Sequence, residues 1–166
     1  VSATAGSTND VILTASGAIT EDGDALTVVR ADELVATAAG AITLDTTVAT
    51  AALAATGAGA IDIDETDAID LASVTTADGS ITVDSGGALT ATDVNSSATD
   101  DDTNDILLTT TAGEIAVVSI NAGSTNDVTL ASAGAITEDG TAAVEVIADV
   151  LTATAGGAIT LDTTVS

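Results

Sequence analysis

Apolar and polar residues alternate in short stretches along the chain, as they do in a β-strand whose side chains point to opposite faces in turn. In the stretch NDVTLAS the apolar positions are Val128 and Leu130, and in GAITLD they are Ile159 and Leu161. Glycine and Asn-Asp pairs, which favour tight turns, separate such stretches. Threonine and β-branched residues dominate, and an apolar spacing of two does not fit a helix. The pattern predicts an all-β chain of short strands.

A ten-residue sequence occurs twice, as AGAITLDTTV at Ala39–Val48 and as GGAITLDTTV at Gly156–Val165. When the first 49 residues are shifted by 117 positions onto the last 49, 34 of the 49 positions are identical. A match of this kind indicates an internal repeat. We expect residues 1–166 to be a single β-solenoid segment, with 1–117 as one long repeat unit and 118–166 as the start of the next copy. The same array is expected to continue on both sides.

A shorter and looser period lies inside the long unit. The motif Gly-x-Ile, mostly at steps of about 19–23 residues, begins at Gly17, Gly40, Gly59, Gly79, Gly113, Gly134 and Gly157. A second marker, Asn-Asp before an apolar strand, occurs at Asn9, Asn104 and Asn126. Five short repeats of about 23 residues in each long unit are typical of a solenoid. These periods predict a parallel β-helix (β-solenoid) of about seven coils, each of roughly 20–23 residues.

Comparison of the two copies predicts which side chains point inward. Five apolar residues are kept, as core positions should be: Leu34, Ala36, Ile42, Leu44 and Val48 recur as Leu151, Ala153, Ile159, Leu161 and Val165. By contrast, Val28 is replaced by Glu145 and Arg30 by Ile147, whereas the residue between them remains valine. Changes at alternate positions are typical of the outward face of a strand. We therefore predict that both changed positions face outward.

Composition narrows the choice of partners. The large apolar residues are Val, Ile and Leu only, because the sequence has no Phe, Tyr, Trp, Met or Cys, and such side chains suit a narrow, layered interior. The chain has 26 acidic residues against the single basic residue Arg30, giving a formal net charge of −25. This charge repels phosphate groups, so we expect no nucleic-acid partner, whereas multivalent cations are favoured. No apolar run approaches the roughly 20 residues that span a bilayer, so no membrane span is expected.

The residue types that carry most enzymatic chemistry are missing. The sequence has no His, Lys, Tyr or Cys to act as a base or nucleophile, and no aromatic residue on which a sugar ring could stack. Paired carboxylates such as Asp62 and Asp64 are the remaining catalytic candidates, and nothing distinguishes them from ordinary surface acids. We therefore expect that the protein is not an enzyme.

Acidic residues are the candidates for a metal site. The fifth residue after the glycine of Gly-x-Ile is acidic in six places, namely Asp22, Asp45, Asp64, Asp84, Asp139 and Asp162. With one copy in each coil these residues would form a column, in which carboxylates about 4.8 Å apart repel by roughly 1 kcal/mol in water. Calcium, which prefers oxygen ligands, could bridge neighbours in the column. The alternative is that each aspartate caps a turn and extends into solvent.

A second acidic group, formed by Asp100, Asp101 and Asp102, lies in VNSSATDDDTND, the one stretch without a strand pattern. We expect a protruding loop there, which either binds calcium loosely or is a solvated charged loop. No cofactor is required by these interpretations, and calcium is the candidate ligand of both acidic groups.

Threonine follows the Gly-x-Ile motif at Thr20, Thr43, Thr82, Thr137 and Thr160. A regular array of hydroxyl and methyl groups on a flat face would suit an ice-binding surface. The alternative is that threonine is a favourable outward residue in a strand.

The strings NDVTLASAGAITEDG and TATAGGAITLDTT resemble the repeats of filamentous-haemagglutinin-like proteins, which are large bacterial surface adhesins. The resemblance implies a right-handed parallel β-helix, export to the bacterial cell surface, and a role in attachment and biofilm. The expected function is that of a structural segment of a long extracellular fibre or adhesin shaft. Its partners would be copies of itself, joined end to end or side by side, and also divalent cations or other cell surfaces. The alternative is a calcium-dependent adhesive or ice-binding module.

Overall fold

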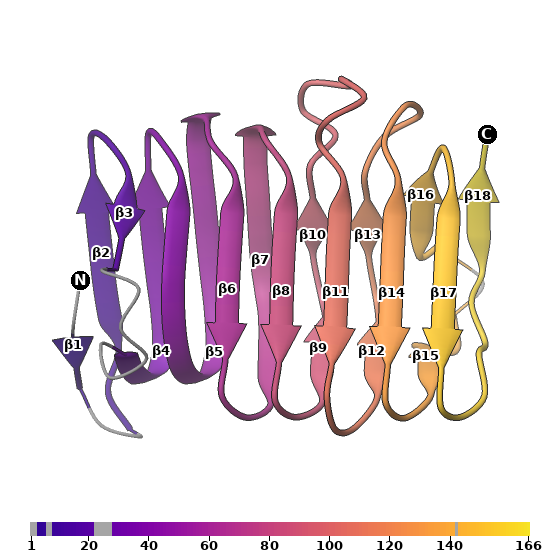
Figure 1. The fold of residues 1–166 in the computed structure, drawn as a ribbon, viewed down its shortest axis with the longest axis horizontal. Helices are drawn as coiled ribbons and strands as arrows, with labels where there is room; N and C mark the ends of the chain where they lie inside the picture. The colour runs from indigo at the N-terminus through magenta and orange to yellow at the C-terminus, as the bar shows by residue number, and fades with distance from the viewer. Residues whose placement is uncertain (1–2, 6–7, 22–27, 142) are drawn as a thin grey trace.

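The computed structural model describes residues 3–5, 8–21, 28–141 and 143–166. Within these residues the chain forms strands and no helix. The strands pair in parallel and wind into a β-solenoid of about seven turns (Figure 1), which confirms the predicted fold class.

The solenoid is flat, with a front layer and a back layer of strands (Figure 1). The front layer contains β3 (Ile19–Thr20), the first part of β5 (Ile42–Ala58), β6 (Ile61–Glu65), β8 (Ile81–Ser85), β11 (Ile106–Thr110), β14 (Val128–Ser132) and β17 (Leu151–Ala155). The back layer contains β2 (Val11–Ala15), most of β4 (Val28–Ala38), the remainder of β5, β7 (Ile69–Asp78), β9 (Leu89–Ala91), β10 (Val94–Asn95), β12 (Ile115–Val117), β13 (Ile120–Asn121), β15 (Ile136–Glu138), β16 (Val146–Ala148) and β18 (Thr163–Val165). The short β1 (Ala3–Thr4) pairs with the beginning of β4.

The coil is right-handed. With the chain running from left to right in Figure 1, the front strands point down and the back strands point up. This sense of winding is the one that parallel strand connections adopt in nearly all proteins, because strands twist to the right.

The register keeps equivalent residues above one another from turn to turn. In the front layer the successive partners are Ile19, Ile42, Ile61, Ile81, Ile106, Val128 and Leu151. The steps between these partners run from 19 to 25 residues, close to the predicted coil length. The longest step, from Ile81 to Ile106, contains the loop between β10 and β11, which protrudes at the top of Figure 1. The protruding loop predicted around Asp100–Asp102 is therefore confirmed.

The interior is built from the alternation seen in the sequence. In β6, the side chains of Ile61 and Ile63 are buried, whereas those of Asp62 and Asp64 are exposed. Equivalent inward residues of successive turns stack into continuous rows of Ile, Val, Leu and Ala between the two layers. Burial of apolar surface in these rows stabilises the fold by about 25 cal/mol per Å², and this is the main force that holds the turns together.

The two copies of the long repeat have the same pairing but lie on opposite layers. Val11 pairs with Leu34, and the matching residues Val128 and Leu151 also pair. The back-layer ladder from Val11 takes five steps, through Leu34, Ala51, Leu71 and Ala91, to Val117. Half a turn later the chain reaches Val128 in the front layer (Figure 1). One long unit therefore spans five and a half turns, so the second copy starts on the opposite layer.

Solvent exposure differs between the two predicted outward positions. Arg30 and Ile147 are exposed, as expected, but Val28 and Glu145 are buried, with exposed fractions of 9% and 1%. Val28 pairs in register with Asp45 and does not belong to the core cluster, so it is a covered residue on the outward face of its strand. The second copy therefore carries a carboxylate at a position that is apolar and buried in the first.

Candidate functional site

Three of the six predicted aspartates form a row on the front layer. Asp45 of β5 pairs in register with Asp64 of β6, which pairs with Asp84 of β8. Asp64 and Asp84 are exposed, and Asp45 is half-buried. The row borders an open groove of about 410 Å³ that is also lined by Val28 and Glu65. The predicted column is thus realised over three turns.

Of the other three predicted aspartates, two lie on the opposite layer and one lies outside the described residues. Asp139 and Asp162 lie beside strands β15 and β18 of the back layer, because the second copy of the repeat is turned to the opposite side. Asp22 lies outside the described residues. In the next turn after Asp84, the paired residue is Thr109, whose hydroxyl donates a hydrogen bond to the Asp84 carboxylate.

Partial burial and neighbouring acids raise the pKa values of two aspartates at and beside this row, Asp45 and Asp62. Partial burial, followed by the negative charges of Glu21 and Asp64, raises the pKa of Asp45 above its ordinary value of 3.8. Partial burial, followed by Asp64 and Asp84, likewise raises the pKa of Asp62. Asp45 and Asp62 therefore hold protons more tightly in the folded chain than in the unfolded chain.

We expect the folded chain to be more stable near pH 4 than near pH 8 in low salt. Raised folded pKa values at Asp45, Asp62 and Glu65 give stability that is complete below the ordinary values of 3.8 and 4.5 and is lost as the pH rises through the raised values. Thermal unfolding followed by circular dichroism should show a melting temperature about 3 °C or more higher at the lower pH. A melting temperature that rises from pH 4 to pH 8 would contradict this expectation.

Asp100 of the protruding loop is held by the following turn. Its carboxylate accepts hydrogen bonds from the backbone N–H groups of Ser124 and Thr125, at 3.1 Å each, and from both of their hydroxyl groups. These hydroxyl and N–H donors lower the pKa of Asp100. Asp101 and Asp102 are exposed. The described contacts of Asp100 therefore fasten the loop to the next turn, and calcium binding by the loop stays a prediction.

The predicted threonine array is divided between the two layers. Thr20, Thr43 and Thr82 belong to one front-layer ladder, but Asp62 lies between Thr43 and Thr82. Thr137 belongs to β15 in the back layer, and the N–H of Thr160 donates a hydrogen bond to the carbonyl of Ile136 in the same strand. A charged residue within the ladder interrupts the regular spacing of hydroxyl and methyl groups that the ice-binding hypothesis needs.

A row of buried polar side chains at one end of the front strands was not predicted from the sequence. Its members pair in register from turn to turn, as Thr46, Glu65, Ser85, Thr110 and Ser132. The hydroxyls of this row bind backbone groups at the corner, as when Ser85 donates to the carbonyl of Asp67 at 2.7 Å. The signal available in the sequence was a polar residue four positions after the first apolar residue of β5, β6, β8, β11 and β14.

Glu65 is the charged member of this buried row. Its Oε2 accepts hydrogen bonds from the Thr46 hydroxyl at 2.8 Å and from the Val48 N–H at 3.0 Å, and its Oε1 accepts one from the Asp67 N–H at 3.2 Å. Burial raises the pKa of Glu65, and the hydrogen bond from Thr46 opposes that effect. The carboxylate therefore connects β6 to the preceding turn.

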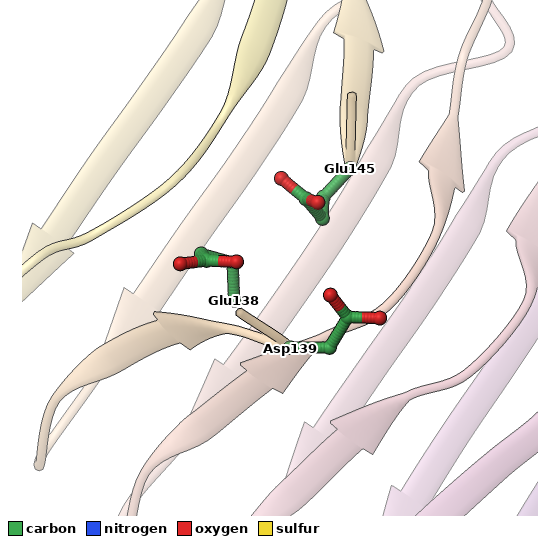
Figure 2. A group of neighbouring side chains, drawn as sticks. All are labelled: Glu138, Asp139 and Glu145. Atoms are coloured by element: carbon green, nitrogen blue, oxygen red, sulfur yellow. The ribbon is translucent and has the colours of Figure 1, made fainter. Parts of the chain in front are cut away.

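One group of acids is close enough to share a cation. Among the described residues, Glu138, Asp139 and Glu145 are the group of three whose carboxylates each bring an oxygen within 4.8 Å of the others. Figure 2 shows them around a gap between the end of β15 and the start of β16. Asp139 belongs to the predicted set, whereas Glu138 and Glu145 do not. Glu145 was missed because its position was predicted to face solvent.

Comparison with known proteins found no relative of this chain. No protein-family model, curated protein or solved structure matches the chain. In the described part of the chain, the structure has no helix of the length and apolar character needed to cross a membrane.

Proposed function

We propose that this chain is a non-enzymatic structural segment of a long extracellular β-solenoid fibre or cell-surface adhesin shaft. The observation that supports the proposal is a difference in burial between identical residues of the two copies. Ile42 and Val48 are 0% and 2% exposed, but the matching Ile159 and Val165 are 48% and 47% exposed. The same apolar sequence is a core in one place and a surface in the other.

The difference has a simple structural cause. Ile42 lies between two neighbouring turns, through its pairing with Ile19 and Ile61. Within the part of the chain that the structure describes, Ile159 pairs only with Ile136 of the preceding turn. One more turn of the kind formed by β5 and β6 would cover Ile159 as it covers Ile42. The surface next to β17 and β18 is therefore complementary to a further copy of the repeat.

The pairing of the two copies allows such growth. Because the pairings of the first unit recur in the second, further units can follow along one axis with the same register. In arrays of this type each turn contacts only its neighbours, and stability increases with every interface that is added. The mechanical role follows from continuous backbone hydrogen bonds along the axis and from the rows of stacked apolar side chains.

The strong negative charge of the chain would control how closely neighbouring shafts approach one another. A formal net charge of −25 keeps neighbouring solenoids apart at low ionic strength, and divalent cations would allow them to approach side by side. The resemblance to large surface adhesins supports a place at the bacterial cell surface and a role in attachment.

A lengthened chain tests the structural part of the proposal. Residues 50–166 appended after Ser166 should continue the coil and lengthen the particle by about 26 Å at constant width, since five and a half turns rise about 4.8 Å each. Small-angle scattering and negative-stain microscopy measure the length, and a chain with the appended residues in scrambled order is the control. Two separate particles joined by a linker would contradict the proposal.

Antibody labelling tests the location. Gold-conjugated antibodies raised against residues 1–166 should label thin filaments on intact cells of the source organism. Label that appears only after the cells are opened would exclude a surface fibre.

A further inference from the structure

Glu145 is a buried carboxylate of which only one oxygen accepts a hydrogen bond from the described residues. Its side chain is 1% exposed, and its Oε2 accepts a hydrogen bond from the Asp162 N–H at 3.1 Å. Its Oε1 is also buried but accepts no hydrogen bond from any described group. An ionised oxygen without a partner is strongly disfavoured away from water, so a positively charged ligand is expected beside it.

The surroundings of Glu145 add negative charge. Glu138 and Asp139 each bring an oxygen within 4.8 Å of it, as Figure 2 shows from the end of β15. Both carboxylates are fixed in place by the loop, because Glu138 accepts a hydrogen bond from the Gly140 N–H at 2.6 Å and Asp139 accepts one from the Thr141 N–H at 2.8 Å. The single basic residue of the sequence, Arg30, lies in β4 near the other end of the solenoid (Figure 1).

The first copy of the repeat provides a natural comparison. It has Glu21 and Asp22 where the second copy has Glu138 and Asp139, but it has Val28 where the second copy has Glu145. The position is buried in both copies, and in the first copy it holds an apolar side chain. The second copy alone has a third carboxylate, and it is the one with the unsatisfied buried oxygen.

We infer that Glu138, Asp139 and Glu145 form a binding site for one divalent cation, and that the cation is calcium. Carboxylate oxygens are the ligands of hard cations, and three carboxylates can supply up to six of the oxygens that calcium requires. Calcium–oxygen distances of about 2.3–2.6 Å allow ligands of one ion to lie up to about 4.6–5.2 Å apart, and the three carboxylates lie within 4.8 Å of one another. Magnesium requires near-ideal octahedral geometry and usually keeps several waters, so a group of protein carboxylates suits calcium better.

The bound cation would close the loop between β15 and β16. Glu138 ends one strand, and Glu145 immediately precedes the other. A shared ion joins the two strand ends across residues 139–145 and fixes the entry to the following turn. The site lies within a single chain, so calcium binding does not require assembly into a fibre.

Calcium titration of the 166-residue protein and of Glu145→Val tests the inference. Isothermal titration calorimetry at physiological ionic strength should find one site per chain in the parent protein and none of comparable affinity in E145V, where affinity falls by about tenfold or more. The melting temperature of the parent should rise more with calcium than with magnesium, whereas that of E145V should rise by the same small amount with either ion. Because valine is the residue of the first copy, E145V should fold and should melt no lower than the parent without calcium.

A variant with one charge removed elsewhere distinguishes calcium binding at this site from general screening of the negative charge. Asp64→Asn removes one charge from the exposed aspartate row and should leave the stoichiometry and affinity of the calcium site unchanged. Magnesium chloride at equal concentration should raise the melting temperature of all three proteins by the same smaller amount. Equal calcium binding by the parent and E145V, or an equal loss in D64N, would overturn the inference.

Discussion

Replacement of Ile42 by alanine should lower the free energy of unfolding by about 3 kcal/mol, whereas the same replacement at Ile159 should lower it by less than about 1 kcal/mol. Both residues lie in the sequence GAITLDTTV. Ile42 is fully buried between two turns, so truncation leaves a cavity that the stacked rows cannot fill. Ile159 is 48% exposed, so its truncation removes fewer contacts and leaves the cavity open to water.

Urea unfolding of the parent and the two variants measures this difference, with equal slopes as the check that the same transition is compared. In the chain lengthened by residues 50–166, the loss at Ile159 should rise to the value found at Ile42, because a following turn would then cover it. Equal losses at the two positions in the 166-residue chain would show that the turns are not the units of packing.

Replacement of Glu65 by alanine should lower the free energy of unfolding by about 3 kcal/mol, because it leaves buried donors without an acceptor. The affected donors are the hydroxyl of Thr46 and the N–H groups of Val48 and Asp67. The first two belong to the preceding turn, so the loss should appear as weaker contact between turns. Hydrogen exchange should show faster exchange at Val48 than at amides of remote turns such as that of Leu130.

Glu65→Gln is the matched control, since glutamine keeps one acceptor oxygen and has no ionisable group. Its loss of stability should be smaller than that of Glu65→Ala. Because the pKa of Glu65 is raised in the fold, the parent is favoured at low pH, and its advantage over E65Q should shrink as the pH rises. An advantage that grows with pH would show that the folded chain stabilises the ionised form instead.

Both expectations treat the contact between turns as the unit of stability. Apolar rows in the middle of the strands and a polar row at the corner join successive turns. In the proposed fibre shaft, these contacts would resist separation of the turns. The aspartate row, the Asp100 contact and the Glu138–Glu145 cluster lie outside these rows, so the proposed cation binding would leave the core unchanged.

The repeat, the strand class and the solenoid architecture follow from the sequence alone. Alternation of Ile and Leu with Thr and Asp specifies strands, because successive side chains of a strand point to opposite faces. A spacing of about 20 residues then sets the length of each turn, and the conserved apolar positions identify most of the core. The register of Ile19 with Ile42 and of Ile61 with Ile81 is what Gly-x-Ile predicts.

The layer on which each side chain lies, and therefore which side chains are neighbours, could be found only from the tertiary structure. Sequence spacing places Asp139 in one column with Asp84, but the long unit spans five and a half turns, so the two residues lie on opposite layers. Burial also departs from the alternation at Glu145, which is 1% exposed although period two predicts exposure. A local pattern fixes how a strand packs, whereas the layer on which it lies depends on the accumulated length of every turn before it. The sequence therefore determined the solenoid, and only the three-dimensional winding decided which acids meet.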